Sequence, residues 1–274
     1  MNKVLAVIPA RRASTRLPDK PLKLIGGKRL LERVYGLALR AKLVSRLVIA
    51  TDDEDIFRMA RDLGAEVIMT SVDCATGTER VAAARAALGD GDWDAVVNIQ
   101  GDMPFLEPSL IDATISLLTT PRSHGAPPFE MTTLATPIFD QQSFTSASTV
   151  KVVVSELSQA LYFSRAPIPH SRDGVRPVLS GRDAAQAVGP TVFGLKHIGL
   201  YVFSPSVLRF FVESKATMLE GVEMLEQLRA LEAGFRIGVF QADPDLTKFS
   251  LEIDTPADLE RAQKIALEFD AKLG

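Results

Sequence analysis

The amino-acid sequence predicts an α/β protein whose mostly parallel sheet is covered by helices on both faces. Short apolar runs rich in β-branched residues alternate with segments of helical periodicity over the first half of the chain. This β-α-β-α-β order is typical of a parallel sheet with right-handed crossovers. The predicted strands are 4–8, 46–51, 66–70 and 94–99, and the predicted helices are 29–42, 54–63, 77–88 and 108–118.

The second half of the chain is less regular, but it shows no repeat, and we expect one domain over residues 1–274. Strands are predicted at 131–137, 150–154, 160–163, 196–203 and 237–241, with a strand-like run at 250–253, and helices at 206–212, 221–233 and 255–269. On the 221–233 helix one apolar face is predicted to enter the core: Met224, Leu225, Leu228 and Leu231. The Gly-, Arg- and Pro-containing stretch 174–190 is predicted to be a loop.

Composition excludes several functional classes. The 31 Lys and Arg against 34 Asp and Glu give a net charge of −3, which argues against a surface that binds nucleic acid or anionic lipid as a whole. The single cysteine, Cys74, forms no intrachain disulfide, which favours a cytoplasmic location. No apolar run approaches the roughly 18 residues of a membrane helix, so we expect no membrane insertion.

A basic loop at residues 8–22 is the first candidate site. It follows a buried strand and carries Arg11, Arg12, Arg16 and Lys20, with the small Ser14 between them. Arginine forks, a lysine and accessible backbone N–H groups are suited to a phosphate chain. A solvated basic loop is the alternative, but the carboxyl end of a strand is where open α/β sheets bind ligands.

Two carboxylates are candidates for a metal site. Asp102 follows the strand at 94–99, and Asp254 precedes the last helix. Mg²⁺ takes one or two protein carboxylates and completes its shell with water and phosphate oxygens, so this pair predicts Mg²⁺ beside a phosphate ligand. Asp254 alone could equally be a turn or capping residue, whereas Gln100 and Gly101 leave room for a ligand beside Asp102.

Polar residues of the second half give weaker signals. His197 and Tyr201 lie four apart on a predicted strand and should face the same side, although a single histidine is more often structural. Arg165 lies in an apolar, Pro-rich setting where a guanidinium needs an anionic partner. On the 221–233 helix a polar face, either solvated or turned to a cleft, carries Glu223, Glu226 and Gln227.

Eight stretches, in order from residue 8 to about 262, resemble the 3-deoxy-manno-octulosonate (Kdo) cytidylyltransferases, the CMP-Kdo synthetases. They are IPARRASTRLPDKPL, IATDDEDI, TGTER, NIQGDMP, ALYFSRAPIP, KHIGLYVF, GVEMLEQLRALEAG and IDTPADLERA. The first is shared with other sugar-nucleotide cytidylyltransferases, whereas YFSRAPIP, HIGLY and EMLEQLR are characteristic of the Kdo group. The chain departs from the common pattern at Thr76, Met103 and Ala257, where serine, an acidic residue and glutamate are usual.

This resemblance implies a three-layer α/β/α Rossmann-like nucleotidyltransferase with a smaller dimerisation and sugar-binding arm at about residues 120–200. It implies a cytoplasmic homodimer that transfers CMP from CTP to Kdo for lipopolysaccharide synthesis, with Mg²⁺ as cofactor. The catalytic residues would be Lys20, Asp102 and Asp254, the last two as metal ligands. The nucleotide would be bound by Arg11, Ser14, Arg16, Lys20, Thr76, Gly77 and Arg80. The sugar would be bound by Gln100, Arg165, His197, Tyr201, Glu223 and Gln227, with Arg165 as partner of its carboxylate.

Alternatives differ in the reaction or in the acceptor. The chain could serve another acidic sugar, such as 8-amino-Kdo or a nonulosonate, or could be a non-catalytic sugar-nucleotide-binding protein. A glycosyltransferase would normally carry an Asp-x-Asp metal pair, and Gln100-Gly101-Asp102 lacks the first acid. A dinucleotide-dependent oxidoreductase is disfavoured because the first strand-to-helix turn has no G-x-G-x-x-G.

Overall fold

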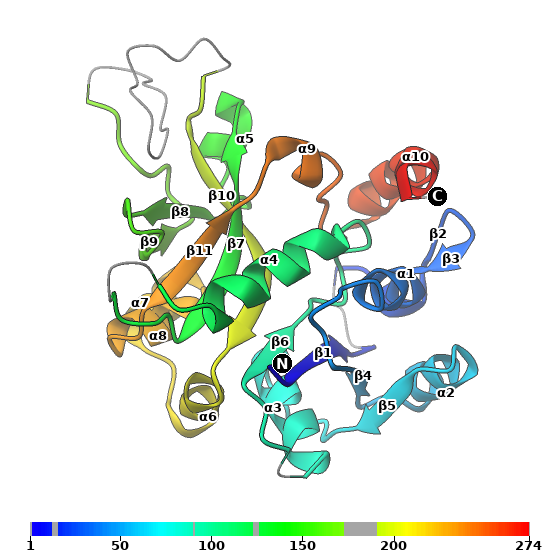
Figure 1. Cartoon of the computed structure of the whole chain (residues 1–274). Helices are drawn as coiled ribbons and strands as arrows, with labels where there is room; N and C mark the ends of the chain where they lie inside the picture. Colours follow the sequence, from blue (N-terminus) through cyan, green and yellow to red (C-terminus); the bar gives the residue numbers. More distant parts are fainter. Residues whose placement is uncertain (1, 13–15, 90, 123–125, 173–190, 274) are drawn as a thin grey trace.

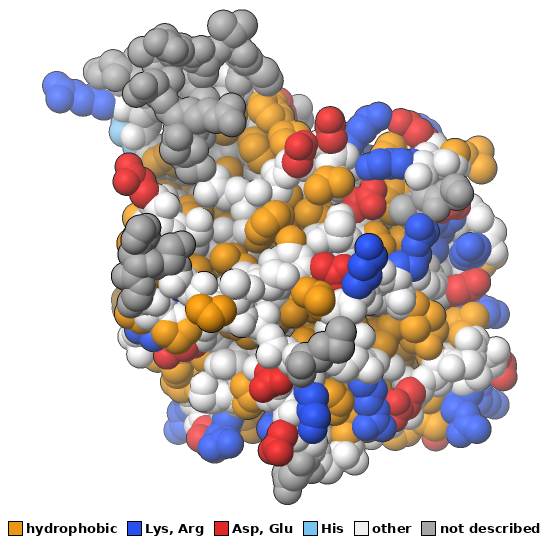
Figure 2. Space-filling view, viewed as in Figure 1, with side chains coloured by type: hydrophobic (Ala, Val, Ile, Leu, Met, Phe, Trp, Pro, Cys, Tyr) orange, Lys and Arg blue, Asp and Glu red, His pale blue; other side chains and the backbone are white. Residues whose placement is uncertain are grey.

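A computed structural model describes residues 2–12, 16–89, 91–122, 126–172 and 191–273 of the chain (Figure 1). Two sequence predictions, for Ser14 and for the stretch 174–190, lie outside the described residues. None of the described helices is long and apolar enough to span a membrane. On the face seen in Figure 2, acidic and basic side chains are interspersed, as the nearly balanced composition predicts.

One mixed sheet organises the described part of the chain. Its strand order is β11-β7-β10-β6-β1-β4-β5, and β8 and β9 branch from β10. The four strands β6, β1, β4 and β5 are mutually parallel, as predicted, whereas β10 runs antiparallel to both β6 and β7. The strands are β1 (Val4–Ala10), β2 (Leu24–Ile25), β3 (Lys28–Arg29), β4 (Arg46–Thr51), β5 (Glu66–Met69), β6 (Ala95–Asn98), β7 (Met131–Ile138), β8 (Lys151–Val154), β9 (Ala160–Ser164), β10 (Gly194–Phe203) and β11 (Ile237–Gln241).

Helices cover both faces of this sheet, so the predicted α/β/α fold class is confirmed (Figure 1). Helices α1, α2, α4 and α10 pack on one face, and α3, α6 and α8 on the other. Strand β1 supplies both cores by alternation, since Val4, Ala6 and Ile8 face the first layer and Leu5 and Val7 the second. The helices are η1 (Lys20–Leu22), α1 (Leu30–Ala38), α2 (Glu54–Asp62), α3 (Gly77–Ala87), α4 (Pro108–Thr119), α5 (Gln141–Thr145), α6 (Pro205–Glu213), α7 (Met218–Glu223), α8 (Gln227–Glu232), α9 (Pro244–Thr247) and α10 (Pro256–Leu273).

The region expected to contribute an arm, about residues 120–200, includes strands both inside and beyond the main path of the sheet. Strands β7 and β10 from this region lie inside the main sheet. Only α5, β8 and β9 extend beyond it, where β8 pairs with residues 195–196 of β10 (Figure 1). The described part of this region therefore combines strands of the main sheet with an antiparallel extension of it.

The prediction of one continuous helix at 221–233 is wrong. Helix α7 ends at Glu223 because Met224 adopts the left-handed conformation, with φ 53° and ψ 49°, and α8 starts at Gln227. The turn removes Met224 from the core, and this side chain is 75% exposed, whereas Leu225 and Leu228 are buried as expected. The strand-like run at 250–253 is also not a strand but an irregular segment before α10.

A bulge in β10 sets the positions of two predicted site residues. His197 pairs with Ala135 and Tyr201 with Thr133 on β7, so the five residues 197–201 of β10 match only three on its neighbour. The two rings consequently lie on the same side with their centroids 5.5 Å apart, which confirms the predicted orientation. The imidazole Nε2 lies 2.9 Å from the Thr133 hydroxyl, and the ring is buried.

This burial makes His197 an uncharged residue of the folded protein. Burial, assisted by the nearby Lys196 charge, lowers the pKa of His197 to about 3, whereas a histidine in an unfolded chain titrates near pH 6.5. As the pH falls through 6.5, the unfolded chain therefore takes up a proton that the folded chain does not. Acidification should destabilise the fold through this group.

We predict that the free energy of unfolding falls by about 1 to 2 kcal/mol more in the wild type than in His197→Gln between pH 6.5 and pH 5. Glutamine lacks a titratable group but keeps a polar atom near Thr133. Urea unfolding of both proteins at the two pH values measures the difference. Stability curves that run parallel would contradict a buried, neutral His197.

Candidate functional site

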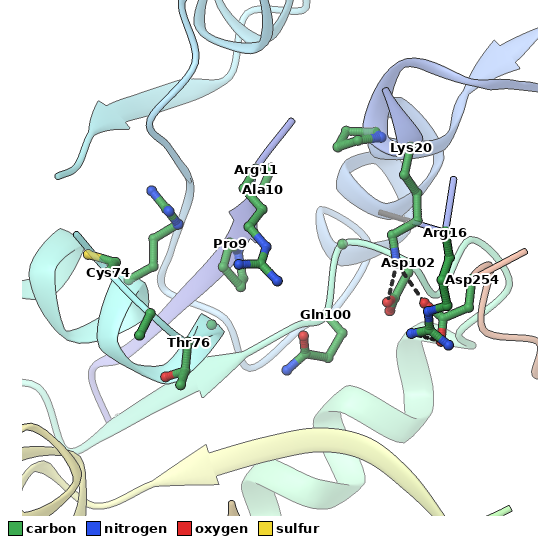
Figure 3. A pocket seen from close by; sticks show the side chains of 15 residues that line it. Pro9, Ala10, Arg11, Arg16, Lys20, Cys74, Thr76, Gln100, Asp102 and Asp254 are labelled. Atoms are coloured by element: carbon green, nitrogen blue, oxygen red, sulfur yellow. Dashed lines mark hydrogen bonds and ion pairs between the residues drawn. The ribbon is translucent and has the colours of Figure 1, made fainter. Parts of the chain in front are cut away.

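A cleft of about 660 Å³ opens at the carboxyl ends of β1 and β6. This volume is within the range of roughly 300–1,000 Å³ that small-molecule sites occupy. Its walls come from the loop after β1, the start of α3, the turn after β6 and the segment before α10 (Figure 3). Gly101 lets two of these walls meet, since a Cβ there would lie 2.9 Å from the Pro9 carbonyl oxygen.

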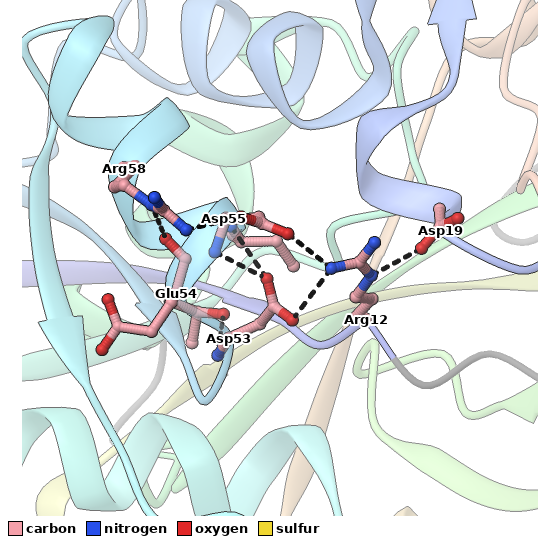
Figure 4. Close-up of polar contacts among 8 residues, drawn as sticks. Arg12, Asp19, Asp53, Glu54, Asp55 and Arg58 are labelled. Carbon is pink, nitrogen blue, oxygen red and sulfur yellow. Dashed lines mark hydrogen bonds and ion pairs between the residues drawn. The ribbon is translucent and has the colours of Figure 1, made fainter.

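The basic residues of the loop after β1 divide between two directions. Arg11 points into the cleft (Figure 3) and forms no hydrogen bond or ion pair within the described residues. Arg12 instead donates to Asp19 at 2.6 Å and to Asp55 at 2.5 Å, outside the cleft (Figure 4). These hydrogen bonds raise the pKa of the Arg12 guanidinium. Arg11 is thus available to a ligand, whereas Arg12 ties the loop to helix α2.

The Arg12 contact also supports the turn that presents Lys20. Asp19 precedes η1 with φ 55°, a left-handed conformation that is uncommon for a residue other than glycine. Its carboxylate is held by Arg12. Lys20 is the first residue of η1, and Pro21 behind it is buried. The position of the Lys20 ammonium therefore depends on a turn that Arg12 braces.

Lys20 lies between two carboxylates from distant parts of the sequence. Its Nζ donates to Asp102 Oδ2 at 2.8 Å and to Asp254 Oδ1 at 3.0 Å (Figure 3). Burial would lower the pKa of Lys20, but the charges and hydrogen bonds of the two carboxylates outweigh it and raise that pKa. Arg16 lies 3.0 Å from the other oxygen of Asp254. The cluster contains two cations and two anions and is formally neutral.

Local contacts fix both carboxylates at this point. The Ile253 N–H donates to the Asp102 carbonyl oxygen at 3.0 Å, which joins the segment before α10 to the turn after β6. At the start of α10, Asp258 accepts from the backbone N–H groups of Asp254 and Thr255, and the Thr255 hydroxyl caps the helix by accepting from the Asp258 N–H. One carboxylate oxygen each of Asp102 and Asp254 therefore lies against the Lys20 ammonium.

The start of α3 forms the opposite wall. Thr76 caps the helix by accepting from the Glu79 N–H at 3.1 Å, and Gly77 lines the cleft without a side chain. Arg80 lines the cleft too, but its guanidinium is buried and paired with Asp52 at 2.7 Å. Helix dipole and backbone N–H groups make this wall suitable for electronegative groups of a ligand.

A second, smaller cavity of about 230 Å³ shares Gln100 and Asp102 with the first. It brings together four of the six residues predicted for the sugar: Gln100, His197, Tyr201 and Gln227. The Tyr201 hydroxyl donates to Gln227 Oε1 at 3.2 Å, and burial raises the pKa of this tyrosine. An acceptor in this cavity would therefore border the ligand of the first cleft at Asp102.

The other two predicted sugar residues, Arg165 and Glu223, line neither cavity. Glu223 accepts from the Arg165 backbone N–H at 2.9 Å and from the Ser164 hydroxyl. The Arg165 guanidinium donates to backbone carbonyls of Glu223 at 2.8 Å and Ala147 at 3.1 Å. In this structure these two side chains hold the end of α7 against β9.

The sequence placed Glu226 on a polar face without assigning it a role, and gave no indication of Lys196 or Glu252 at the site. Glu226 accepts from the hydroxyls of Thr76 at 3.0 Å and Thr78 at 2.6 Å, and thereby ties the start of α3 to the turn between α7 and α8. Burial raises the pKa of Glu226, although these hydroxyls oppose the shift. Lys196 and Glu252 line the second cavity. The sequence did not indicate that Lys196 lies in the same cavity as His197, because neighbouring residues on a regular strand face opposite sides.

Comparison with known proteins agrees with this geometry. A sequence model of the family described as "Cytidylyltransferase" matches residues 5–237. The 3-deoxy-manno-octulosonate cytidylyltransferase of Syntrophotalea carbinolica is 43% identical over 261 residues, covering 95% of this chain and 97% of that protein. The enzyme of the same name from Bdellovibrio bacteriovorus is 40% identical over 263 residues, covering 96% and 97%.

Solved structures lead to the same family. The structure of CMP:2-keto-3-deoxy-manno-octonic acid synthetase complexed with CTP superposes with a TM-score of 0.80 at 33% identity, covering 97% of this chain and 99% of that one. A cytidylyltransferase from Leptospira borgpetersenii, at 18% identity and a TM-score of 0.59, shares the fold. The resemblance found in the sequence motifs is thereby confirmed, and the chain belongs to the cytidylyltransferase family of nucleotidyltransferases, among the 3-deoxy-manno-octulosonate cytidylyltransferases.

Proposed function

We propose that this chain transfers CMP from CTP to Kdo, forming CMP-Kdo and pyrophosphate for lipopolysaccharide synthesis. The observation that carries the proposal is the junction of the two cavities at Gln100 and Asp102. A nucleotide in the larger cleft and a sugar in the smaller cavity would meet beside the carboxylate pair. The printed names of the relatives, and the CTP in the related synthetase, support the assignment of the two substrates.

In this proposal the nucleotide occupies the larger cleft. Arg11, Arg16 and Lys20 supply positive charge for the triphosphate, and Ser14 belongs to the same loop. Thr76, Gly77 and Arg80 form the wall that would bind the cytidine. Because Arg80 is already paired with Asp52, its role would be to hold this wall in place.

We also propose that Asp102 and Asp254 hold Mg²⁺. The donor set fits this ion, because two carboxylate oxygens already converge on one cation, Lys20. No cluster of three or more metal-binding side chains occurs among the described residues, so substrate oxygens or water would complete the coordination shell. The charge balance favours added positive charge, since the Arg16, Lys20, Asp102 and Asp254 cluster is neutral before the triphosphate binds. When bound, Mg²⁺ would offset the charge of the triphosphate and of the departing pyrophosphate.

The reaction joins the anomeric oxygen of the sugar to the α-phosphorus of CTP. The bond from this phosphorus to the bridging oxygen breaks, pyrophosphate leaves, and the hydroxyl proton is lost to solvent. Positioning and charge neutralisation carry most of the catalysis. Lys20 would stabilise charge that develops on pyrophosphate, and Gln100, Tyr201 and Gln227 would orient the sugar through hydrogen bonds.

Further expectations come from the family resemblance and the composition. We expect a homodimer that acts in the cytoplasm, with CTP and Kdo as substrates and no nucleic acid as partner. Arg165 and Glu223 would serve the sugar site by holding the α7–α8 turn, which carries Gln227.

The first test is the choice of acceptor. With CTP and Mg²⁺, we expect pyrophosphate release with Kdo and much slower release with 8-amino-Kdo or a nonulosonate. An assay that measures pyrophosphate for each sugar in turn identifies the substrate. Faster release with another sugar would replace Kdo, and CTP binding without release for any acidic sugar would point to a non-catalytic binding protein.

The carboxylate pair gives a second prediction. Asp102→Asn keeps the shape of the side chain but removes its charge, and should lower turnover by on the order of 10²-fold or more. Steady-state rates at saturating Mg²⁺ and substrates measure the loss. Asp62→Asn, an exposed change at the end of α2, is the matched control. Near wild-type turnover by the Asp102 variant would sink the proposed metal site.

The ion pairs of Arg12 with Asp19 and Asp55, which hold the basic loop at residues 8–22, give a third prediction. Arg12→Ala frees Asp19 and should raise the KM for CTP by about 2- to 10-fold, with a smaller change in the KM for Kdo, because exposed ion pairs contribute modestly. Arg58→Ala is the control, since Arg58 pairs with the same Asp55 at 2.7 Å but lies outside the loop (Figure 4). Equal KM values for the two variants would show that Arg12 does not act through the loop.

A further inference from the structure

The acceptor of the proposed reaction is an acid, so its cavity needs a cation. Kdo is a 2-keto acid sugar, whose anomeric carbon is attached directly to the carboxylate carbon. The attacking hydroxyl and the carboxylate therefore enter the site together, close to Asp102 and to the triphosphate. The Arg16, Lys20, Asp102 and Asp254 cluster is neutral, and its cations and the proposed Mg²⁺ are shared with the triphosphate, so a further cation that lines the acceptor cavity would favour binding of the carboxylate.

We propose that Lys196, rather than Arg165, holds the carboxylate of the acceptor sugar and determines specificity for acidic sugars. This inference rests on the proposed function and names a residue within it. Among the described residues that line the second cavity, Lys196 is the one cation. His197 beside it is buried against Thr133 and neutral.

Lys196 is available for this role. Its ammonium makes no hydrogen bond or ion pair within the described residues, and the side chain is only partly exposed. Its backbone lies in β10 with β7 on one side and β8 on the other, since Lys196 pairs with Thr136 and with Lys151. The two neighbouring strands fix the position of the Lys196 backbone in the cavity wall, while its unpaired side chain can adjust to a ligand.

Arg165 is not available in the same way. Its guanidinium donates to the carbonyl oxygens of Glu223 and Ala147, and its backbone N–H is held by the Glu223 carboxylate. It lines neither cavity. To bind a sugar carboxylate, Arg165 would have to give up contacts that hold α7, and these carbonyls would lose their donors.

Acidic groups in the cavity strengthen the assignment. Glu252 lies on the wall with Lys196, and Asp102 lies at the junction with the nucleotide cleft. The Asp102 carboxylate repels another carboxylate and Lys196 attracts it, so charge directs the sugar carboxylate toward Lys196. The neutral polar groups that remain, Gln100, Tyr201 and Gln227, suit hydroxyls.

The test compares Kdo with its carboxamide, a neutral analogue of nearly the same shape. For the wild type we expect kcat/KM to be higher for Kdo by about 10- to 100-fold, the effect of one charge-assisted contact. Lys196→Met should lose about this factor with Kdo and change little with the carboxamide, so that the preference disappears. Lys196→Arg should retain the preference, and Lys196→Gln serves as a second neutral variant.

Arg165→Met is the matched comparison. Because it loosens the α7–α8 turn, we expect it to lower kcat/KM for both sugars by a similar factor. An intact preference for Kdo in both neutral Lys196 variants, or a preference lost in Arg165→Met instead, would overturn the assignment. The KM for CTP and the thermal unfolding midpoint verify that each variant is folded. A wild type that releases no pyrophosphate with Kdo would instead overturn the proposed function, and this assignment with it.

Discussion

The ion pairs of Lys20 with Asp102 and Asp254 are the constraint on which the site depends. They join the loop after β1, the turn after β6 and the segment before α10, which are separated by 82 and 234 residues in the sequence. Two carboxylates that converge on one point repel each other unless a cation lies between them. The two carboxylates therefore need a cation beside them both before and after a ligand binds. Because the cluster of Arg16, Lys20, Asp102 and Asp254 is neutral, binding of a triphosphate there favours additional positive charge.

The arginines around the cleft have two different roles: some face the space where a ligand would bind, and others hold the walls of the cleft in position. Arg11 and Arg16 line the cleft. Arg12 forms ion pairs with Asp19 and Asp55, and Arg80 forms an ion pair with Asp52. Such pairs add little to stability when they are exposed. Their effect is geometric, because they set the two walls between which a ligand would lie. A basic loop thus contributes to affinity both through charges that face the ligand and through charges that do not.

The parts of the fold that follow local rules could be predicted from the sequence, including the alternation of strands and helices and the acidic pair Asp102 and Asp254. The break at Met224 could not, because helical periodicity continues through it. Distant contacts decide it, since Glu226 bonds to α3 and the Arg165 side chain bonds to the Glu223 carbonyl. The same break buries Gln227 and leaves Met224 outside the core.

The acceptor cavity likewise depends on contacts between residues that are distant in the sequence. The sequence motif indicates a binding role for Arg165, because an arginine in an apolar setting needs an anionic partner. In the structure Arg165 instead contacts the Glu223 carboxylate through its backbone N–H and backbone carbonyls through its guanidinium. Lys196 attracts no attention in the sequence, because on a regular strand it would face away from His197. Both nevertheless line one cavity, although the bulge of β10 lies beyond them, between Ile198 and Tyr201. The cation that we assign to an acidic ligand is therefore one that lines the acceptor cavity, which a motif alone does not reveal.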